Sequence, residues 1–178
     1  MSLSLVLIDW ENISKGFVES EHPPETFSVS AAFDGLFDWI NSETDEILDT
    51  FLFAPLYIVY TNYQLFYDQG LFPITCPRVP LGSPKSKDTV DEALIKRAER
   101  WITYPGLTHV CLVSGDRDFI PLLKEVKQKG LLIMISAIDP ARAKNPEHPP
   151  LSRELSEMAD ISPKTGKKMI HYFSPIIR

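Results

Sequence analysis

A short apolar run near the middle of the chain constrains the fold more than any other feature. The four consecutive residues Val110–Val113 are apolar, and two of them are β-branched valines. An uninterrupted run of this kind is typical of a strand buried on both faces of a parallel sheet. The Ser114-Gly115 pair that follows predicts a turn, and apolar residues at helical spacing begin at Phe119. The stretch therefore predicts a strand, a turn and a helix, which is the repeating unit of an open α/β sheet.

The same alternation of apolar strands and amphipathic helices continues along the chain. Besides the run at 110–113, we expect strands at 3–8, 51–60, 73–79, 131–135 and 168–173. Helices are expected at 29–40, around 63–67, at 88–104, from 119 to a glycine cap at 130, and at 151–158. Residues 10–24 end in a Pro-Pro pair and are interpreted as a loop. This pattern predicts an α/β fold in which a doubly wound, mostly parallel sheet forms the centre of three layers.

The chain is expected to form a single domain over residues 1–178. It is long enough to bury about two thirds of the surface of the unfolded chain, and 44% of its residues are hydrophobic. Residues 139–150 contain four prolines and predict a surface loop. Residues 151–178 predict a C-terminal helix and strand that complete the domain.

The charge of the chain limits the partners that it attracts. There are 18 Lys and Arg against 24 Asp and Glu, and the net charge of −6 gives no general attraction for nucleic acid. A polyanionic partner therefore needs a local basic surface or a bound metal. Lys164, Lys167 and Lys168 are a candidate phosphate contact, although a solvated surface is the simpler interpretation. The charged run Glu43–Asp49 is expected to be a solvated helix end and turn.

The cysteines and the longest apolar run indicate the compartment. Cys76 and Cys111 have no metal-ligand partner at C-x-x-C spacing, so we expect reduced thiols in a cytoplasmic protein. The run Phe51–Val59 is too short to span a bilayer, and the N-terminus lacks the basic start of a signal peptide. No membrane partner is expected.

Four aspartates are placed where a fold of this kind would bring them together. Asp9 ends the first strand, and Asp116 and Asp118 follow the central strand, at the end of the sheet where ligands bind. Asp91 lies three residues before Leu94 on the apolar stripe of its helix, so it points to the interior or to a cleft. Helix capping and turn formation are the alternative explanation. At about 6 Å and an effective dielectric of about 20, each carboxylate pair would repel by about 3 kcal/mol, so such a pocket needs Mg²⁺ or Mn²⁺, or raised pKa values.

Short acidic side chains with oxygen ligands favour a hard cation that keeps several waters, the usual device for phosphate ester chemistry. Asn12 offers another oxygen near the end of the first strand. Ser114 has no partner base, so its hydroxyl is expected to fix the turn or a metal-bound water. The four histidines are scattered and are interpreted as incidental, and no G-x-G-x-x-G, P-loop, H-E-x-x-H or G-x-S-x-G motif is present.

Three stretches, L-V-L-I-D-W-E-N, K-S-K-D-T-V-D-E-A-L and L-V-S-G-D-R-D-F, together resemble the NYN domain family, including its LabA-like members, within the PIN-like nuclease superfamily. The order and spacing of these stretches agree with the family over residues 3–136. The S-G-D-x-D-F element is the most specific of the three. The resemblance implies a three-layer α/β/α PIN-like, Rossmann-like fold and a metal-dependent endoribonuclease that hydrolyses RNA phosphodiester bonds through an activated water.

The resemblance also implies roles for individual residues. The catalytic metal ligands would be four aspartates, Asp9, Asp91, Asp116 and Asp118, with Mg²⁺ or Mn²⁺ as the cofactor. Asn12, Lys87 and Ser114 would be the substrate-binding residues, and the partner would be single-stranded or structured RNA. Many members carry another acid about six residues after the position of Asp91, whereas this chain has Arg97 there.

Two alternatives to a nuclease stay open at this point. The first is an RNA-binding or regulatory module of the same fold with weak or no catalysis, which Arg97 and the acidic total charge favour. The second is a signalling or phosphatase domain with an acidic pocket. A receiver domain needs a phosphoacceptor Asp at the end of its third strand, and I-T-C-P-R-V provides none. A homodimer or a protein partner is compatible with every one of these readings.

Overall fold

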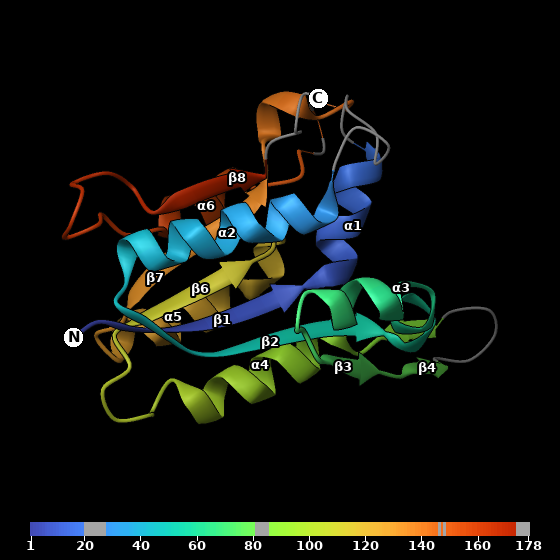
Figure 1. Ribbon diagram of the computed structural model, residues 1–178, viewed down its shortest axis with the longest axis horizontal. Coiled ribbons are helices and arrows are strands. Elements are labelled where there is room, and N and C mark those ends of the chain that lie inside the picture. The colour runs from blue at the N-terminus through green and yellow to red at the C-terminus, as the bar shows by residue number, and fades with distance from the viewer. Residues whose placement is uncertain (20–27, 81–85, 146, 148, 174–178) are drawn as a thin grey trace.

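A six-stranded sheet forms the centre of the protein, and all its strands are parallel (Figure 1). The computed structural model describes residues 1–178 apart from 20–27, 81–85, 146, 148 and 174–178. Across the sheet the strand order is β3-β2-β1-β6-β7-β8. The strands are β1 (Leu3–Asp9), β2 (Glu46–Pro55), β3 (Pro73–Cys76), β6 (His109–Val113), β7 (Leu132–Ile138) and β8 (Ile170–Phe173).

Helices cover both faces of this sheet, which confirms the predicted three-layer α/β/α arrangement (Figure 1). One face carries α1 (Trp10–Glu19), α2 (Val29–Glu43) and α3 (Leu56–Asp68). The other carries α4 (Val90–Trp101), α5 (Ile120–Gln128) and α6 (Arg153–Met158). Alternate residues of β1 enter the two apolar cores, because successive side chains of a strand point to opposite faces. The short elements are the antiparallel pair β4 (Arg78–Pro80) and β5 (Ser86–Asp88) and the 3₁₀ turns η2 (Arg117–Phe119) and η3 (Pro140–Arg142).

The order of the strands places a switch point between β1 and β6. The chain builds outward from β1 through β2 to β3, then returns to the other side of β1 and builds outward again through β7 and β8. In the register of β1 and β6, Leu5 lies opposite Val110 and Ile8 lies opposite Val113. The carboxyl ends of these two strands are therefore level. Open α/β sheets bind their ligands at such a point.

The structure corrects the prediction of a loop after the first strand. Residues 10–19 form the helix α1, and Trp10, Ile13 and Phe17 are buried at helical spacing. The Asp9 side chain caps this helix, because its Oδ1 accepts a hydrogen bond of 3.2 Å from the backbone N–H of Asn12. The helix also packs tightly, since a Cβ at Gly16 would lie 2.7 Å from Cγ1 of Ile138.

The prediction for residues 43–60 is wrong in its boundaries. Strand β2 begins at Glu46 and ends at Pro55, because its backbone pairs with β1 from Leu3 to Asp9 whatever the polarity of its side chains. Helix α3 begins directly after Pro55, where the expected strand continued. Glu43 is buried and accepts a hydrogen bond from the Ser162 hydroxyl, so it is not part of a solvated turn.

The structure also differs from the prediction in smaller ways at residues 73–79. The expected strand at 73–79 is divided into β3 and β4, and residues 81–85 lie outside the described residues. The proline-rich segment 139–150 contains only η3 as a regular element in its described part. Strand β8 pairs in parallel with β7. Among the described residues, no helix is both long and apolar enough to cross a membrane.

Candidate functional site

Asp9 is a buried carboxylate at the switch point. It is the last residue of β1, and only 4% of its surface is exposed. Both carboxylate oxygens accept hydrogen bonds, Oδ1 from the backbone N–H of Asn12 and Oδ2 from the Ser114 hydroxyl at 3.1 Å. These contacts link the end of β1 to the start of α1 and to the turn after β6.

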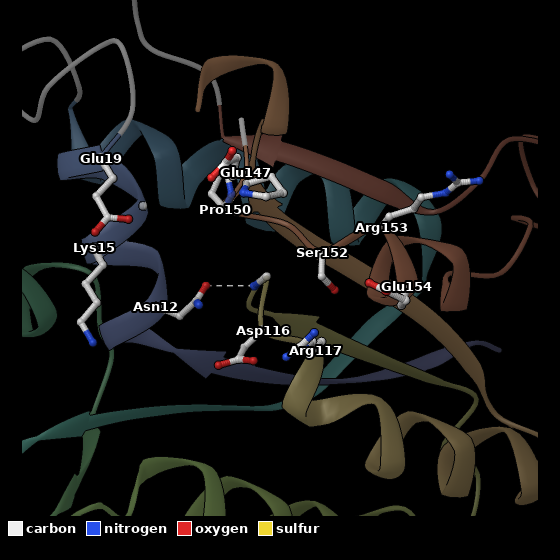
Figure 2. Close-up of a pocket in the computed structure, with 13 residues that line it drawn as sticks. Asn12, Lys15, Glu19, Asp116, Arg117, Glu147, Pro150, Ser152, Arg153 and Glu154 are labelled. Atoms are coloured by element: carbon white, nitrogen blue, oxygen red, sulfur yellow. Dashed lines mark hydrogen bonds between the residues drawn. The ribbon is translucent and has the colours of Figure 1, made fainter. Parts of the chain in front are cut away.

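The turn after β6 is held by its neighbours on both sides. The backbone N–H of Gly115 donates to Oδ1 of Asn12 at 2.9 Å, which Figure 2 shows as a dashed line. The carbonyl of Gly115 accepts a bond of 3.1 Å from the N–H of Ser152. A Cβ on residue 115 would collide with the carbonyl oxygen of Pro150, so only glycine fits this close approach. The Ser114 hydroxyl also accepts from the N–H of Asp116 at 3.2 Å, and it fixes the turn as the sequence predicts.

The two aspartates of this turn differ in position. Asp116 caps η2, because its Oδ1 accepts a bond of 2.9 Å from the N–H of Asp118. The capping explanation therefore holds for Asp116, which is half-buried and also reaches the cleft described next. Asp118 is exposed and is not among the residues that line the cleft.

Three of the four predicted aspartates line one cleft of about 290 Å³. Asp9 comes from β1, Asp116 from the turn after β6, and Asp91 from the first turn of α4. This cleft, which we call the aspartate cleft, is completed by Glu11, Asn12, Lys15, Arg78 and Val90. Segments that lie far apart in the sequence thus meet at the carboxyl end of the sheet.

The surroundings of Asp9 favour its protonated form. Burial raises the pKa of Asp9 from 3.8 to about 7, and the negative charges of Asp91 and Asp116 contribute to this rise. The hydrogen bonds from Asn12 and Ser114 act in the opposite direction but do not cancel it. Near neutral pH Asp9 is therefore only partly ionised, and a bound cation would favour its ionised form.

The donor set fits a hard cation that keeps part of its water shell, and it does not form a closed cage. Among the described residues, no three His, Cys, Asp or Glu side chains lie close enough together to hold an ion by themselves. Mg²⁺ is usually bound by one or two carboxylates and retains several waters. A buried carboxylate with a pKa of about 7, facing two further carboxylates across a small cleft, suits that mode of binding.

Two basic side chains at the cleft were missed by the sequence prediction. Lys15 Nζ lies 2.8 Å from Oε1 of Glu11, one helical turn away on α1. Arg78 of β4 lies with its guanidinium 4.8 Å from the centre of the Tyr57 ring. Lys15 is the only Lys or Arg among the first 50 residues, and this could have marked it as a candidate site residue. It was missed because residues 10–24 were predicted to form a loop, whereas α1 places Lys15 one helical turn after Asn12.

The basic residues that the sequence predicted as phosphate contacts are not among the described residues that line the aspartate cleft. The side chain of Lys87 lies outside what the structure describes. Lys164 pairs with Asp45 at 3.1 Å, and Asp45 bonds to Ser2 at the amino end of the sheet, the opposite end from Asp9. The candidate phosphate contact at Lys164 to Lys168 is therefore remote from the aspartate cleft.

Arg97, where many family members have an acid, does not line the aspartate cleft. Its guanidinium lies 5.0 Å from the centre of the Phe51 ring, beside a separate hollow of about 620 Å³ that Phe37 and Ile74 also line. Arg97 is therefore not one of the charged residues that line the aspartate cleft.

A larger hollow of about 700 Å³ adjoins the aspartate cleft and shares Asn12, Lys15 and Asp116 with it (Figure 2). Figure 2 shows side chains of both charges around this hollow: the bases include Arg117 and Arg153, and the acids are Glu19, Asp116, Glu147 and Glu154. The aspartate cleft and this larger hollow therefore share part of their lining.

The cysteines and the described histidines take no part in the cleft. Cys76 and Cys111 are buried, and burial raises the pKa of the Cys111 thiol. His171 packs between Trp39 and Phe173, and its Nδ1 lies 2.9 Å from the Ser136 hydroxyl. His22 and His148 lie outside the described residues.

An all-parallel sheet between two layers of helices is the architecture expected of a three-layer α/β/α PIN-like fold. A crystal structure of a protein of unknown function from Vibrio parahaemolyticus has the same fold. The two agree with a TM-score of 0.66 at 17% identity, over 89% of this chain and 90% of the other. No curated protein matches the chain.

The family model described as NYN domain matches residues 5–160, and the chain belongs to this family of the PIN-like nuclease superfamily. Membership implies a nuclease-type fold and ribonuclease activity. NYN domains are generally RNA-binding nucleases, and PIN-like nucleases generally use divalent metals. The alternative of a receiver or phosphatase domain has no support from this match.

Proposed function

We propose that the protein is a ribonuclease that hydrolyses RNA phosphodiester bonds in the aspartate cleft with the help of Mg²⁺ or Mn²⁺. The observation that carries this proposal is the buried Asp9, whose pKa is raised to about 7 by burial and by the two carboxylates that face it. Perturbed acids in a cleft mark functional sites more often than structural ones. Family membership supports the same activity.

Asp9, Asp91 and Asp116 would hold the ion, together with water. When bound, such an ion lowers the pKa of a water and neutralises charge on the phosphate. We assign Asp118 a supporting role, because its backbone N–H fixes the carboxylate of Asp116. Asn12 and Ser114 hold the residues of the cleft in place. Asn12 accepts a hydrogen bond from the Gly115 N–H, and the Ser114 hydroxyl donates one to Asp9.

Lys15 and Arg78 supply the positive charge that an RNA strand needs in a chain with a net charge of −6. Both line the aspartate cleft, and Lys15 also lines the larger hollow with Arg117 and Arg153. Charge-assisted hydrogen bonds from these groups to phosphate oxygens would fix the strand across the cleft. We also propose Lys87 as a further phosphate contact, as the resemblance to the family implies.

Cleavage of end-labelled RNA by purified protein tests the proposal. The wild type should cleave in Mg²⁺ or Mn²⁺ and not in EDTA. We expect Asp9→Asn and Asp116→Asn to reduce the rate at least about 100-fold, because each removes a charge that would hold the ion. Asp34→Asn is the matched control, since Asp34 is exposed on α2 away from the cleft. Wild-type rates in both Asp9→Asn and Asp116→Asn would overturn the proposal.

A second candidate is an RNA-binding module of the same fold that has lost turnover. It is favoured by one observation, namely that no three ligand side chains in the described part of the chain already form an ion site. This candidate predicts RNA binding that is equal in Mn²⁺ and EDTA, without cleavage of any substrate. Metal-dependent cleavage that disappears in Asp116→Asn would exclude it.

A further inference from the structure

Helix α3 presents a row of tyrosines to solvent. Tyr60 is 85% exposed, and Tyr63 and Tyr67 are each 62% exposed. Their spacing of three and four residues places them on one side of the helix, while Val59 and Phe66 of the opposite side are buried in the core. Large rings exposed in a contiguous patch mark a binding surface more often than single exposed rings do. These three rings therefore do not pack against the sheet.

The row begins at the aspartate cleft. Tyr57, 48% exposed in the first turn of α3, donates its hydroxyl to Oε1 of Glu11 at 3.5 Å. Arg78 donates to the Tyr57 hydroxyl at 3.3 Å and lies over its ring. Glu11 and Arg78 both line the aspartate cleft. Figure 1 shows α3 near the arrowhead end of β2, on the same face of the sheet as α1. We call Tyr57, Tyr60, Tyr63 and Tyr67 the tyrosine face.

The charge along α3 suits a polyanion. The segment Leu56–Asp68 contains one charged residue, Asp68 at its end, and that carboxylate accepts a bond of 2.7 Å from Gln64. Helices α1, α2, α4 and α6 each carry at least two acids, whereas α3 carries one, at its end. In a chain with 24 acids and 18 bases, the tyrosine face is therefore a helix surface that a phosphate backbone can approach with little repulsion.

The geometry of the rings suits stacked bases. The Tyr63 and Tyr67 rings are nearly parallel, with 21° between their planes and 6.4 Å between their centres. From Tyr57 to Tyr67 the helix rises about 15 Å, since each residue adds about 1.5 Å. At about 3.4 Å per stacked nucleotide, this length matches about four bases.

We propose that the tyrosine face stacks the unpaired bases of an RNA strand whose phosphate backbone continues into the aspartate cleft. The substrate class would then be single-stranded RNA with several nucleotides on one side of the bond that is cut. This inference rests on the proposed function of that cleft. Stacking tolerates any base, because every base has a π face, but a duplex hides those faces within its own stack.

Fluorescence anisotropy with a labelled 12-nucleotide RNA tests this inference. Binding is measured in Asp9→Asn protein and again in wild-type protein with EDTA, so that no cleavage is required. The triple variant Tyr60→Ala/Tyr63→Ala/Tyr67→Ala should bind at least about 100-fold more weakly, since each lost stack weakens binding by at least about fivefold. The corresponding triple Tyr→Phe variant should bind within about threefold of the parent, because it retains the rings. All these rings are mostly exposed, so the melting temperature should not change.

The controls separate stacking from other roles. Tyr104→Ala removes a tyrosine that is 44% exposed just beyond the end of α4, and it should bind RNA normally. A duplex of the same length should bind weakly to all variants. The inference is overturned if the triple Ala variant binds as tightly as its parent, or if the triple Phe variant loses binding as well.

Two results distinguish this inference from others. A dimer of the parent, seen by sedimentation and lost in the triple Ala variant while RNA binding stays normal, would assign the face to a second copy of the chain and overturn the inference. Ring-dependent RNA binding by a wild type that cleaves nothing would overturn the nuclease proposal and support the tyrosine face.

Discussion

The carboxylate of Asp9 is almost completely buried, so its ionised form has a cost in free energy. Burial and two neighbouring carboxylates raise the pKa of Asp9 to about 7, although two hydrogen bonds stabilise its charge. A pKa shift of one unit corresponds to about 1.4 kcal/mol, so the ionised form costs about 4 kcal/mol relative to the unfolded chain. A bound cation would remove most of that cost.

The first prediction concerns the pH dependence of stability without metal. The pKa of Asp9 is higher in the folded protein than in the unfolded chain, so the folded protein binds the proton more tightly. The stabilisation is present in full below about pH 4 and is lost as the pH rises through about 7. In EDTA, the free energy of unfolding of the wild type should fall between pH 4 and pH 8 by about 4 kcal/mol more than that of Asp9→Asn. Urea denaturation at several pH values measures this difference, and parallel curves would contradict it.

The second prediction concerns Gly115. Gly115→Ala should lower the free energy of unfolding by about 1–3 kcal/mol, because a Cβ there meets the Pro150 carbonyl and the backbone at Leu151. Gly35→Ala is the matched control, since no atom lies within 4 Å of a Cβ at this exposed position of α2. It should stabilise the protein by about 0.5–1 kcal/mol through better helix propensity. Denaturant unfolding measures both values. An unchanged free energy of unfolding in Gly115→Ala would contradict the prediction and show that residues 150–152 can move to accommodate a Cβ.

At the scale of elements, α1 and the turn after β6 form the frame of the aspartate cleft. Asn12 joins them, because its side-chain oxygen accepts the buried N–H of Gly115. The same turn holds Asp116, and α4 brings Asp91 from the other face of the sheet. The relative position of the three carboxylates therefore depends on contacts between elements.

The third prediction concerns this link. Asn12→Ala leaves the N–H of Gly115 without its acceptor, so the free energy of unfolding should fall by about 1–3 kcal/mol. The variant should also need more Mn²⁺ for half-maximal cleavage, because Asp116 is no longer held in register with Asp9. A titration of cleavage rate against Mn²⁺ measures the second effect. An unchanged Mn²⁺ requirement together with reduced stability would limit Asn12 to a structural role.

The elements that the sequence predicted well are those with a clear apolar period. The strands β1, β6 and β7 are mostly apolar, and α2 and α4 each have a single apolar stripe, so their local sequence is enough to predict them. The α1 helix was missed because its short apolar side follows an acid and precedes two prolines. Aromatic composition was also a poor guide to burial in α3, where Phe66 is buried and the tyrosines are exposed.

The site was predictable where the fold alone positions a residue. Asp9 and Asp116 follow strands that end at the switch point, and Asp91 shares the buried stripe of α4, so three of the four aspartates could be expected together. Asp118 lies outside because η2 turns it to solvent. Lys15 and Arg78 reach the cleft through contacts of α1 and β4 that no local pattern encodes.

At the scale of the whole molecule, a chain with a net negative charge needs Lys and Arg side chains close to its active cleft if it is to bind RNA. The net charge of −6 opposes a polyanion in general, and Lys15, Arg78, Arg117 and Arg153 lie around the cleft and the larger hollow. A bound divalent ion would reverse the local repulsion further. The entire scheme therefore depends on the affinity of the aspartate cleft for a cation.

Thermal melting with and without Mn²⁺ tests this dependence most directly. At an Mn²⁺ concentration of about 100 times the dissociation constant, the wild type should gain about 2.7 kcal/mol of stability. Asp34→Asn should gain as much, whereas Asp9→Asn and Asp116→Asn should gain little or nothing. A wild type that melts at the same temperature with and without Mn²⁺, or an Asp9→Asn variant that is stabilised equally, would contradict a cation site in the aspartate cleft.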